Sequence, residues 1–420
     1  MAEASESVAQ YSKDELNPPD FLNQEFFQTV LQDAENDKAL KITKLNIIPG
    51  TKPGDHFASV MYKAIVSYTT KGKDIDSRSL VVKTLPTDDS VKKEILKDMP
   101  IFDREIDMYT KVLPEMKKIM DSIGDNEQMS PRILYYSREL PIIIFEDITK
   151  QGYEMNQEFW DFDNTIKILK KLAKFHALSF YMNDNKYAHK MDFENYKPIL
   201  ITEKSIDQMQ TFVNGLSSLV EEIDTWPGFE DIARKLEGVI PTLLKAVLDI
   251  YKPNPEPGFN VLCHGDFNLK NLMYKKNGKD IDNMLFIDFQ MSFWTSPAVD
   301  LLYVMNVIGN QEVRRRRGEA VMIYHEVFTD YLSRLGCLRK GPSLRDLNID
   351  MLKYGKVEVH IGVGFMPIFY LDFANNDVVA AADLTNYNQK NFYDVIYKNP
   401  KITDIMKEIL QTLYYKGLLD

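Results

Sequence analysis

The sequence predicts an α+β fold of two lobes, in which an antiparallel sheet with helices comes first and a mostly helical part follows. Between residues 40 and 85, and again between 133 and 145, apolar residues alternate or form the short runs typical of strands. From about residue 163 onward, apolar residues recur mainly at helical spacing. We expect a first lobe over residues 1–145, a hinge over 146–153 and a second lobe over 154–420.

The composition is that of an ordinary globular protein, with 420 residues, 44% hydrophobic and 27% charged. A net charge of -11 argues against a nucleic-acid partner. Two cysteines fit a reducing compartment. No apolar run approaches the roughly 18 residues of a membrane helix, and the polar N-terminus lacks the basic and apolar regions of a signal peptide. We therefore expect no membrane partner, a cytoplasmic location and, for the oligomeric state, a monomer.

Individual elements follow from the same patterns. Phe27, Val30, Leu31 and Ala34 fall on one face of an expected helix. A second amphipathic helix is expected around residues 102–109, and a long one begins at a cap formed by Asp163 or Asn164. The expected strands cover residues 40–48, 60–68, 79–85, 133–136 and 142–145.

Residues 261–288 carry polar groups at a spacing that suits phosphoryl transfer. Asp266 follows a short apolar run, Asn271 lies five residues later, and Asp288 follows a second apolar run. Transfer from a nucleotide needs a carboxylate that accepts the proton of the attacking hydroxyl, and oxygen ligands that hold Mg²⁺. The pattern predicts Asp266 as the base and Asn271 and Asp288 as metal ligands. The alternative is a solvated polar loop between two buried strands.

These motifs, His264-Gly265-Asp266 with Asn271 and Asp288-Phe289-Gln290, resemble those of aminoglycoside phosphotransferases, choline kinases and, in particular, the ecdysteroid kinase-like family. The resemblance extends over nearly the whole chain, from about residue 19. It implies a protein-kinase-like fold, ATP and Mg²⁺ as cofactors, and phosphate transfer to an alcohol such as an ecdysteroid, as in an ecdysteroid 22-kinase. The chain departs from the family pattern at Asn268, where members often carry Trp.

The nucleotide is expected to bind the first lobe. The turn after residue 48 is predicted to place backbone N–H groups over the phosphates; its candidate residues are Gly50, Gly54, Phe57, Ala58 and Ser59. An ordinary hairpin loop is the alternative. In the resembling families, backbone groups of a hinge pair with adenine, and Glu146 and Ile148 take these positions here.

Lys83 lies inside an otherwise apolar strand, where an ammonium group is costly to bury without a partner. The resemblance implies that it binds the nucleotide phosphates together with a helix glutamate. Glu105, in Phe102-x-x-Glu105-x-x-x-Tyr109, is the first candidate and Glu94 the alternative. A lysine on the exposed face of an edge strand would explain the same pattern without a function.

The acceptor is expected in the second lobe, whose many Phe, Met and Tyr residues favour a steroid-like or polycyclic alcohol. Choline, an aminoglycoside or a xenobiotic alcohol stays an alternative, as does a nucleotide-binding pseudokinase that acts as a carrier. Three further residues or runs have structural interpretations. His176 is expected in the core, Asp300 is expected to tie the loop of Asp266 in place, and residues 314–317, four arginines, are expected on a solvated helix face.

Overall fold

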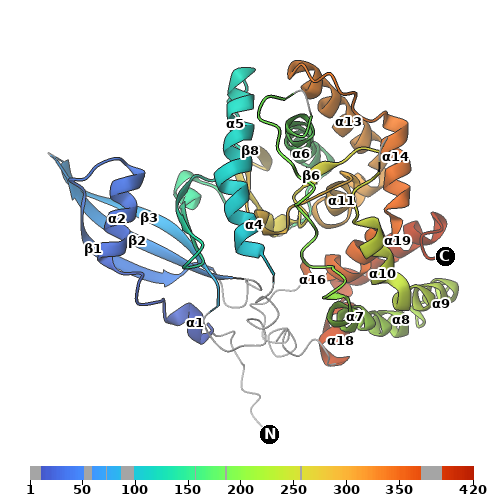
Figure 1. Cartoon of the computed structure of the whole chain (residues 1–420). Coiled ribbons are helices and arrows are strands. Elements are labelled where there is room, and N and C mark those ends of the chain that lie inside the picture. The colour runs from blue at the N-terminus through green and yellow to red at the C-terminus, as the bar shows by residue number, and fades with distance from the viewer. Residues whose placement is uncertain are drawn as a thin grey trace, which may run out of the picture.

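The computed structural model describes residues 11–51, 59–71, 73–86, 99–156, 158–184, 187–255, 258–369 and 390–420. A five-stranded antiparallel sheet at one end of the molecule is followed by a mostly helical region (Figure 1). The predicted α+β architecture is confirmed. The candidates Gly54, Phe57, Ala58 and Glu94 lie outside the described residues.

The sheet has the strand order β1-β2-β3-β5-β4, and every neighbouring pair is antiparallel. Its members are β1 (Lys41–Pro49), β2 (Val60–Thr70), β3 (Lys73–Thr84), β4 (Ile133–Ser137) and β5 (Ile142–Glu146). Strand β3 begins six residues before the position that alternation predicted, because residues 73–78 pair with the end of β2. Pairing with a neighbour, rather than burial, extends this strand.

Two N-terminal helices, α1 (Lys13–Leu16) and α2 (Gln24–Ala34), lie beside the sheet (Figure 1). The α2 face predicted from the sequence is the buried one, and Phe27, Val30 and Leu31 pack into a sheet core with residues of β2, β3 and β5. Asn23 caps α2 by accepting a hydrogen bond from the Phe26 amide. This core is separate from the larger core of the helical region.

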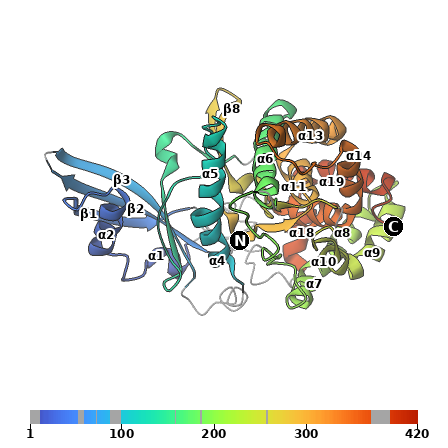
Figure 2. The same cartoon turned by 45° about the horizontal axis from the view of Figure 1, so that its top comes forward.

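Helix α4 (Ile101–Asp107), the π-helix η1 (Met108–Val112) and α5 (Leu113–Ser122) form one continuous rod between the sheet and the other helices, as Figures 1 and 2 show. Its buried residues, such as Ile106 and Met116, belong to the helical core. The rod therefore packs on the helical region although it lies between two strands of the sheet in sequence.

Helix α6 (Phe162–Met182) lies within the helical region (Figure 2), and most of its residues are buried. Its N-cap is Asp161, whose side chain accepts from the Asn164 amide, so the predicted cap at Asp163 or Asn164 is wrong. Those two residues already lie in the first turn, and Asn164 instead donates to the Lys279 carbonyl and accepts from the Ile281 amide. Several polar residues lie near the start of this helix. Asp161 is the N-cap because its backbone is extended, with φ -64° and ψ 175°, as an N-cap residue requires.

The remaining elements surround α6 and the loop of Asp266. The short ones are η2 (Ile148–Gln151), β6 (Val261–Cys263), η4 (Leu269–Asn271), β7 (Leu272–Asn277), β8 (Asp280–Phe286), η5 (Phe289–Met291) and β9 (Phe293–Thr295). The helices are α7 (Ile206–Asn214), α8 (Leu216–Ile223), α9 (Glu230–Val239), η3 (Ile240–Thr242), α10 (Leu243–Ile250), α11 (Ala298–Tyr303), η6 (Val304–Ile308), α12 (Gln311–Arg315), α13 (Arg317–Arg334), α14 (Leu344–Lys353), α15 (Gly355–Val359), η7 (His360–Phe365), α16 (Met366–Phe369), α18 (Lys390–Tyr397) and α19 (Pro400–Tyr415).

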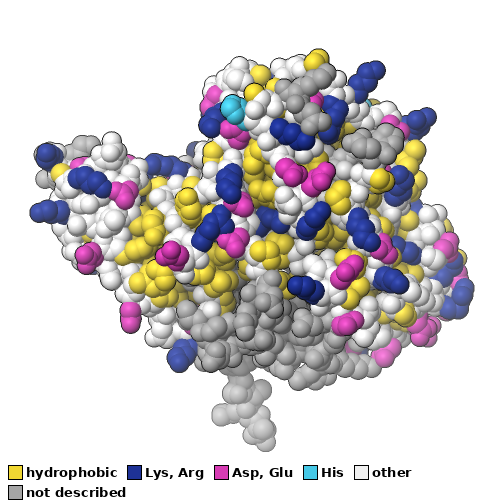
Figure 3. Space-filling model, in the orientation of Figure 1, with side chains coloured by type: hydrophobic (Ala, Val, Ile, Leu, Met, Phe, Trp, Pro, Cys, Tyr) yellow, Lys and Arg dark blue, Asp and Glu magenta, His cyan; other side chains and the backbone are white. Residues whose placement is uncertain are grey.

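The run of arginines forms the solvated face that the sequence predicted only in part, because Arg315 is exposed and Arg316 is partly exposed, whereas the other two are more buried. The break between α12 and α13 falls inside the run, so its side chains point in different directions. Arg314 pairs with Glu408 at 2.9 Å and Arg317 with Glu358, and both guanidinium groups are largely buried. On the face shown in Figure 3, basic and acidic side chains are interspersed rather than gathered by sign. No helix within the described ranges has the length and apolar character needed to cross a membrane.

Candidate active site

A buried carboxylate holds the loop of residues 264–271, which we name the HGD loop. Asp300, on α11, accepts hydrogen bonds from the His264 amide at 2.7 Å and the Gly265 amide at 3.0 Å. His176, on α6, contributes a third bond, with 3.0 Å between its Nε2 and Asp300 Oδ2. Because a carboxylate only accepts, His176 donates through Nε2, and its Nδ1 lies 2.8 Å from the Tyr324 hydroxyl. The predictions for Asp300 and His176 are both confirmed.

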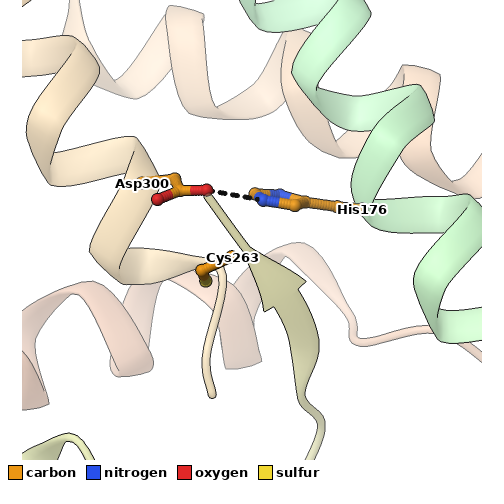
Figure 4. A group of neighbouring side chains, drawn as sticks. All are labelled: His176, Cys263 and Asp300. Atoms are coloured by element: carbon orange, nitrogen blue, oxygen red, sulfur yellow. Dashed lines mark hydrogen bonds and ion pairs between the residues drawn. The ribbon is translucent and has the colours of Figure 1, made fainter. Parts of the chain in front are cut away.

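The same region contains the one group of described side chains that approaches a metal-binding arrangement. His176, Cys263 and Asp300 each offer a ligand atom, and these atoms lie within 4.8 Å of one another (Figure 4). Figure 4 shows His176 directed at Asp300 rather than at a shared centre. Cys263 donates to the Ser296 carbonyl, and burial raises the pKa of its thiol well above the usual value, which disfavours the thiolate that a metal would need. We interpret the group as a hydrogen-bonded core.

Glycine is the residue that fits the second position of the HGD loop. Gly265 has φ +82°, in the left-handed region, and a Cβ there would lie 2.2 Å from the Met291 carbonyl oxygen. The preceding His264 bonds through Nε2 to the Ile287 carbonyl at 2.9 Å. That bond joins the HGD loop to Asp288, which follows β8 and itself has φ +62°. The two motif segments are thus held against each other by side chain and backbone.

Both carboxylate oxygens of Asp266 are held by side-chain amides. Asn268 Nδ2 donates to Oδ1 and Asn271 Nδ2 donates to Oδ2, each at 2.9 Å. Burial, and after it the Asp288 carboxylate, raises the pKa of Asp266, while the two amides act in the opposite direction. The Asn268 contact was not predicted, and the only signal for it in the sequence was that this position departs from the family pattern.

Lys83 lies at the centre of an ion cluster. Its Nζ is 2.6 Å from Glu105 Oε2, 2.9 Å from Asp288 Oδ1 and 3.3 Å from Gln290 Oε1. Strand β3 lies between β2 and β5, so Lys83 is not on an edge strand, and its side chain is only 4% exposed. Burial alone would lower the pKa of Lys83, but the Asp288 and Glu105 carboxylates outweigh it and raise that pKa above its usual value. The Gln290 contact was not predicted.

The remaining candidates lie at strand ends of the sheet or, for Ile148, at the start of η2. Gly50 donates to the Met61 carbonyl, and a Cβ there would meet the Met61 backbone at 3.0 Å, so the chain runs close to β2. Ser59 is buried just before β2. The Glu146 amide donates to the Arg132 carbonyl. Within the described part of the chain, the buried Ile148 amide has no acceptor, since it opens the turn of η2.

Residues 53–337 match the ecdysteroid kinase-like family. The chain belongs to this family. It is, at that level, a small-molecule kinase, and the predicted two-lobed kinase-like fold is confirmed. The match includes the HGD loop and the Lys83 cluster, and it ends before all of the described helices that follow α13.

The solved structures that the chain matches have low sequence identity to it and low TM-scores. The microcompartment-associated aminopropanol kinase is 13% identical, with 93% of this chain and 99% of that chain covered and a TM-score of 0.43. The GDP complex of aminoglycoside 2'-phosphotransferase-IIIa is 12% identical, with the same coverage and a TM-score of 0.40. APH(3'')-Id from Streptomyces rimosus ATCC10970, in complex with ADP and streptomycin, is 13% identical. The match covers 80% of this chain and 99% of that chain, with a TM-score of 0.26. No match was found among curated proteins.

Proposed function

We propose that this protein transfers the γ-phosphate of ATP to an alcohol hydroxyl, most of all that of an ecdysteroid or a similar polycyclic alcohol. The observation that carries the proposal is the Lys83 ammonium, which is buried between Glu105 and Asp288. A buried ammonium group held by two carboxylates, next to the HGD loop with its Asp266 carboxylate, suits the binding and positioning of a nucleotide's phosphates. Family membership supports the same reaction type.

The roles of the charged groups follow from their contacts. Glu105 and Gln290 fix Lys83 Nζ, so that the ammonium is oriented for a phosphate oxygen without rearrangement. Asp288 uses Oδ1 for Lys83, and its Oδ2 has only a long 3.5 Å contact with Gln290. Asn271 uses its NH₂ group for Asp266. Asp288 Oδ2 and Asn271 Oδ1 therefore suit Mg²⁺, which would neutralise phosphate charge when bound.

Asp266 is the proposed general base. Its two amide partners favour the ionised form that accepts the hydroxyl proton of the acceptor. The segment from Gly50 to Ser59, which includes the candidates Gly54, Phe57 and Ala58, is proposed to cover the phosphates. The Ile148 amide and the backbone of Glu146 are proposed to meet adenine, and the unpaired state of that amide supports this. We also propose that the first lobe ends at residue 145, and that the hinge ends and the second lobe begins after residue 153.

The experiment is an assay of the purified protein with ATP, Mg²⁺ and a mixture of alcohols that includes steroid-like alcohols, choline and an aminoglycoside. Mass spectrometry of the mixture identifies any molecule that gains a phosphate. We expect a steroid-like alcohol to be phosphorylated in preference to the two cationic acceptors. A preference for choline or the aminoglycoside would overturn the acceptor class, and ADP binding without any phosphorylated product would favour the pseudokinase carrier.

A matched variant tests whether the nucleotide binds as proposed. Lys83→Met should lose most ATP binding or turnover while thermal melting shows a folded protein. Lys174→Met is the control, because Lys174 lies on α6 and pairs with Asp125 at 2.7 Å, outside the Lys83 cluster and the proposed hinge. Equal ATP turnover by Lys83→Met and the wild type would show that this cluster has a structural role only.

A further inference from the structure

Two buried tyrosines lie beside the HGD loop and have no function in the proposal so far. Tyr251 directly follows α10, and its ring centroid is 4.9 Å from that of Phe293. Phe293 pairs with Cys263 across β6 and β9, and its ring would meet a Cβ on Gly265 at 3.0 Å. Tyr303 ends α11, three residues after Asp300, which holds the backbone of the same loop. Both rings are therefore positioned by elements that build the loop.

Like those of Tyr109 and Tyr153, the hydroxyl groups of these two tyrosines have no hydrogen-bond partner among the described residues, in contrast to those of several other buried tyrosines. Buried hydroxyls are normally hydrogen-bonded, and several in this chain are: Tyr324 to His176, Tyr354 to Thr295 and Tyr397 to the Val363 carbonyl. The side chains of Tyr251 and Tyr303 are 6% and 4% exposed, yet neither hydroxyl bonds to any described residue. Neither of these two hydroxyl oxygens is completely shielded from solvent, whereas the unpaired Tyr274 hydroxyl is. Both hydroxyls thus stay open to a binding partner.

The electrostatics are consistent with two protonated donors near the base. Burial, and then the Asp266 carboxylate, raises the pKa of Tyr303 well above its usual value, and Tyr251 and Asp300 add to the shift. Burial also raises the pKa of Tyr251, with contributions from Cys263, Asp300 and Asp266. Because Asp266 and Asp300 act on both phenols, each hydroxyl lies within electrostatic reach of the HGD loop, and each keeps its proton at neutral pH.

We propose that Tyr251 and Tyr303 bind oxygen atoms that the acceptor carries beside its reacting hydroxyl, so that the acceptor is an uncharged polyol rather than a simple mono-alcohol. A phenol hydroxyl both donates to and accepts from an alcohol, whereas it can only accept from an ammonium N–H and offers a quaternary ammonium only the face of its ring. The Phe293 ring supplies an apolar wall next to Tyr251. This inference rests on the proposed function, because it places the acceptor against Asp266.

The test combines Tyr251→Phe, Tyr303→Phe and the double variant with two probes, a steroid triol and the matching steroid mono-alcohol. Phenylalanine keeps each ring and its packing and removes only the hydroxyl. We expect each single change to weaken triol binding to the ADP-loaded protein by roughly 3- to 10-fold, the range for one neutral hydrogen bond. Binding of the mono-alcohol and of ADP should not change. Calorimetry measures both, and thermal melting checks the fold.

Tyr274→Phe is the matched control, since it removes an enclosed hydroxyl from β7, and it should leave triol binding as in the wild type. Equal triol binding by the wild type and the double variant would overturn the inference, as would a wild type that binds the triol no better than the mono-alcohol. The readout is binding and not turnover. A wild type that binds the triol through these tyrosines but never phosphorylates it would therefore refute the proposed function and leave this inference standing.

Discussion

Two carboxylates, Asp300 and Asp288, lie on either side of the HGD loop, and they are bonded in opposite ways. Asp300, on the helical side, is fully buried and accepts from two backbone amides and one imidazole. Asp288, on the sheet side, has a side chain that is 29% exposed and one firm partner, Lys83. Asp266, between them, has one amide on each oxygen and an acidic neighbour that raises its pKa.

This difference distinguishes the carboxylate that stabilises the HGD loop from the carboxylates that are proposed to take part in the reaction. Asp300 is fully enclosed, with three fixed donors on its two oxygens, so it has no capacity left for a ligand, and its removal leaves buried donors without acceptors. A carboxylate with an open oxygen beside a buried cation keeps binding capacity at the expense of stability. The predictions below test this contrast, in order of decreasing expected effect.

Asp300→Ala should be the most destabilising single change, because it leaves the His264 and Gly265 amides and His176 without their acceptor. We expect a loss of about 3–5 kcal/mol in the free energy of unfolding, as for other broken buried pairs. Urea denaturation gives the value. Asp282→Ala, at an exposed position on β8, is the control and should change it by no more than about 0.5 kcal/mol. Similar losses for the two variants would refute the supporting role of Asp300.

The buried His360 tests whether a side chain without hydrogen-bond partners always indicates a functional site. Neither ring nitrogen has a hydrogen-bond partner among the described residues, and burial lowers the pKa of His360 from 6.5 to about 4. The folded state therefore keeps His360 neutral, and the stability present above pH 6.5 is lost as the pH falls towards 4. The loss should reach about 3 kcal/mol.

His360→Phe should remove that part of the acid sensitivity, with little effect on phosphate transfer at neutral pH. Free energies of unfolding at pH 7 and pH 4.5 measure it, and His189→Gln, at an exposed position, is the control. If His360→Phe abolished turnover without a change in its pH-dependent stability, the absence of partners would mark a functional group here as well.

Asp266→Asn and Asp288→Asn should separate the roles of these two carboxylates. Asp266→Asn is expected to keep its Mg²⁺–ATP affinity and to lose turnover by roughly 100-fold, the lower end for removal of a general base, or about 2.7 kcal/mol. Asp288→Asn is expected to lose nucleotide affinity as well as rate, because it weakens both the Lys83 pair and the proposed metal site. Calorimetry and single-turnover rates provide the two values. The reverse pattern would exchange the two roles.

Asn268→Ser should give the smallest effect, because it removes one of two amides from Asp266. Serine still accepts from the Lys270 amide, as Asn268 does, but is too short to reach Asp266 Oδ1. We expect kcat to fall by about 10-fold, or about 1.4 kcal/mol, while KM for ATP stays constant. Asn310→Ser, at the cap of α12, is the matched control. A change in KM for ATP with kcat intact would show that Asn268 positions the nucleotide instead.

The sequence by itself determined the elements and the local part of the site. Strands were visible because one face of a half-buried strand is apolar, and Asp266, Asn271 and Asp288 were visible because a short loop and hairpin bring them together. Gly265 belongs to the same class, since its conformation is set by the loop. These features depend on residues close in sequence.

Only the tertiary structure decided which groups meet across long separations. It paired Lys83 with Glu105, and it brought Asp288 and Gln290, 205 and 207 residues away, to the same ammonium. It also selected Asp161 as the cap of α6, divided the arginine run between two helices, and placed Tyr251 and Tyr303 beside the HGD loop. The physical reason is that burial and partner choice depend on how α4, α6, α10 and α11 pack, and no pattern within one segment records how it packs against another.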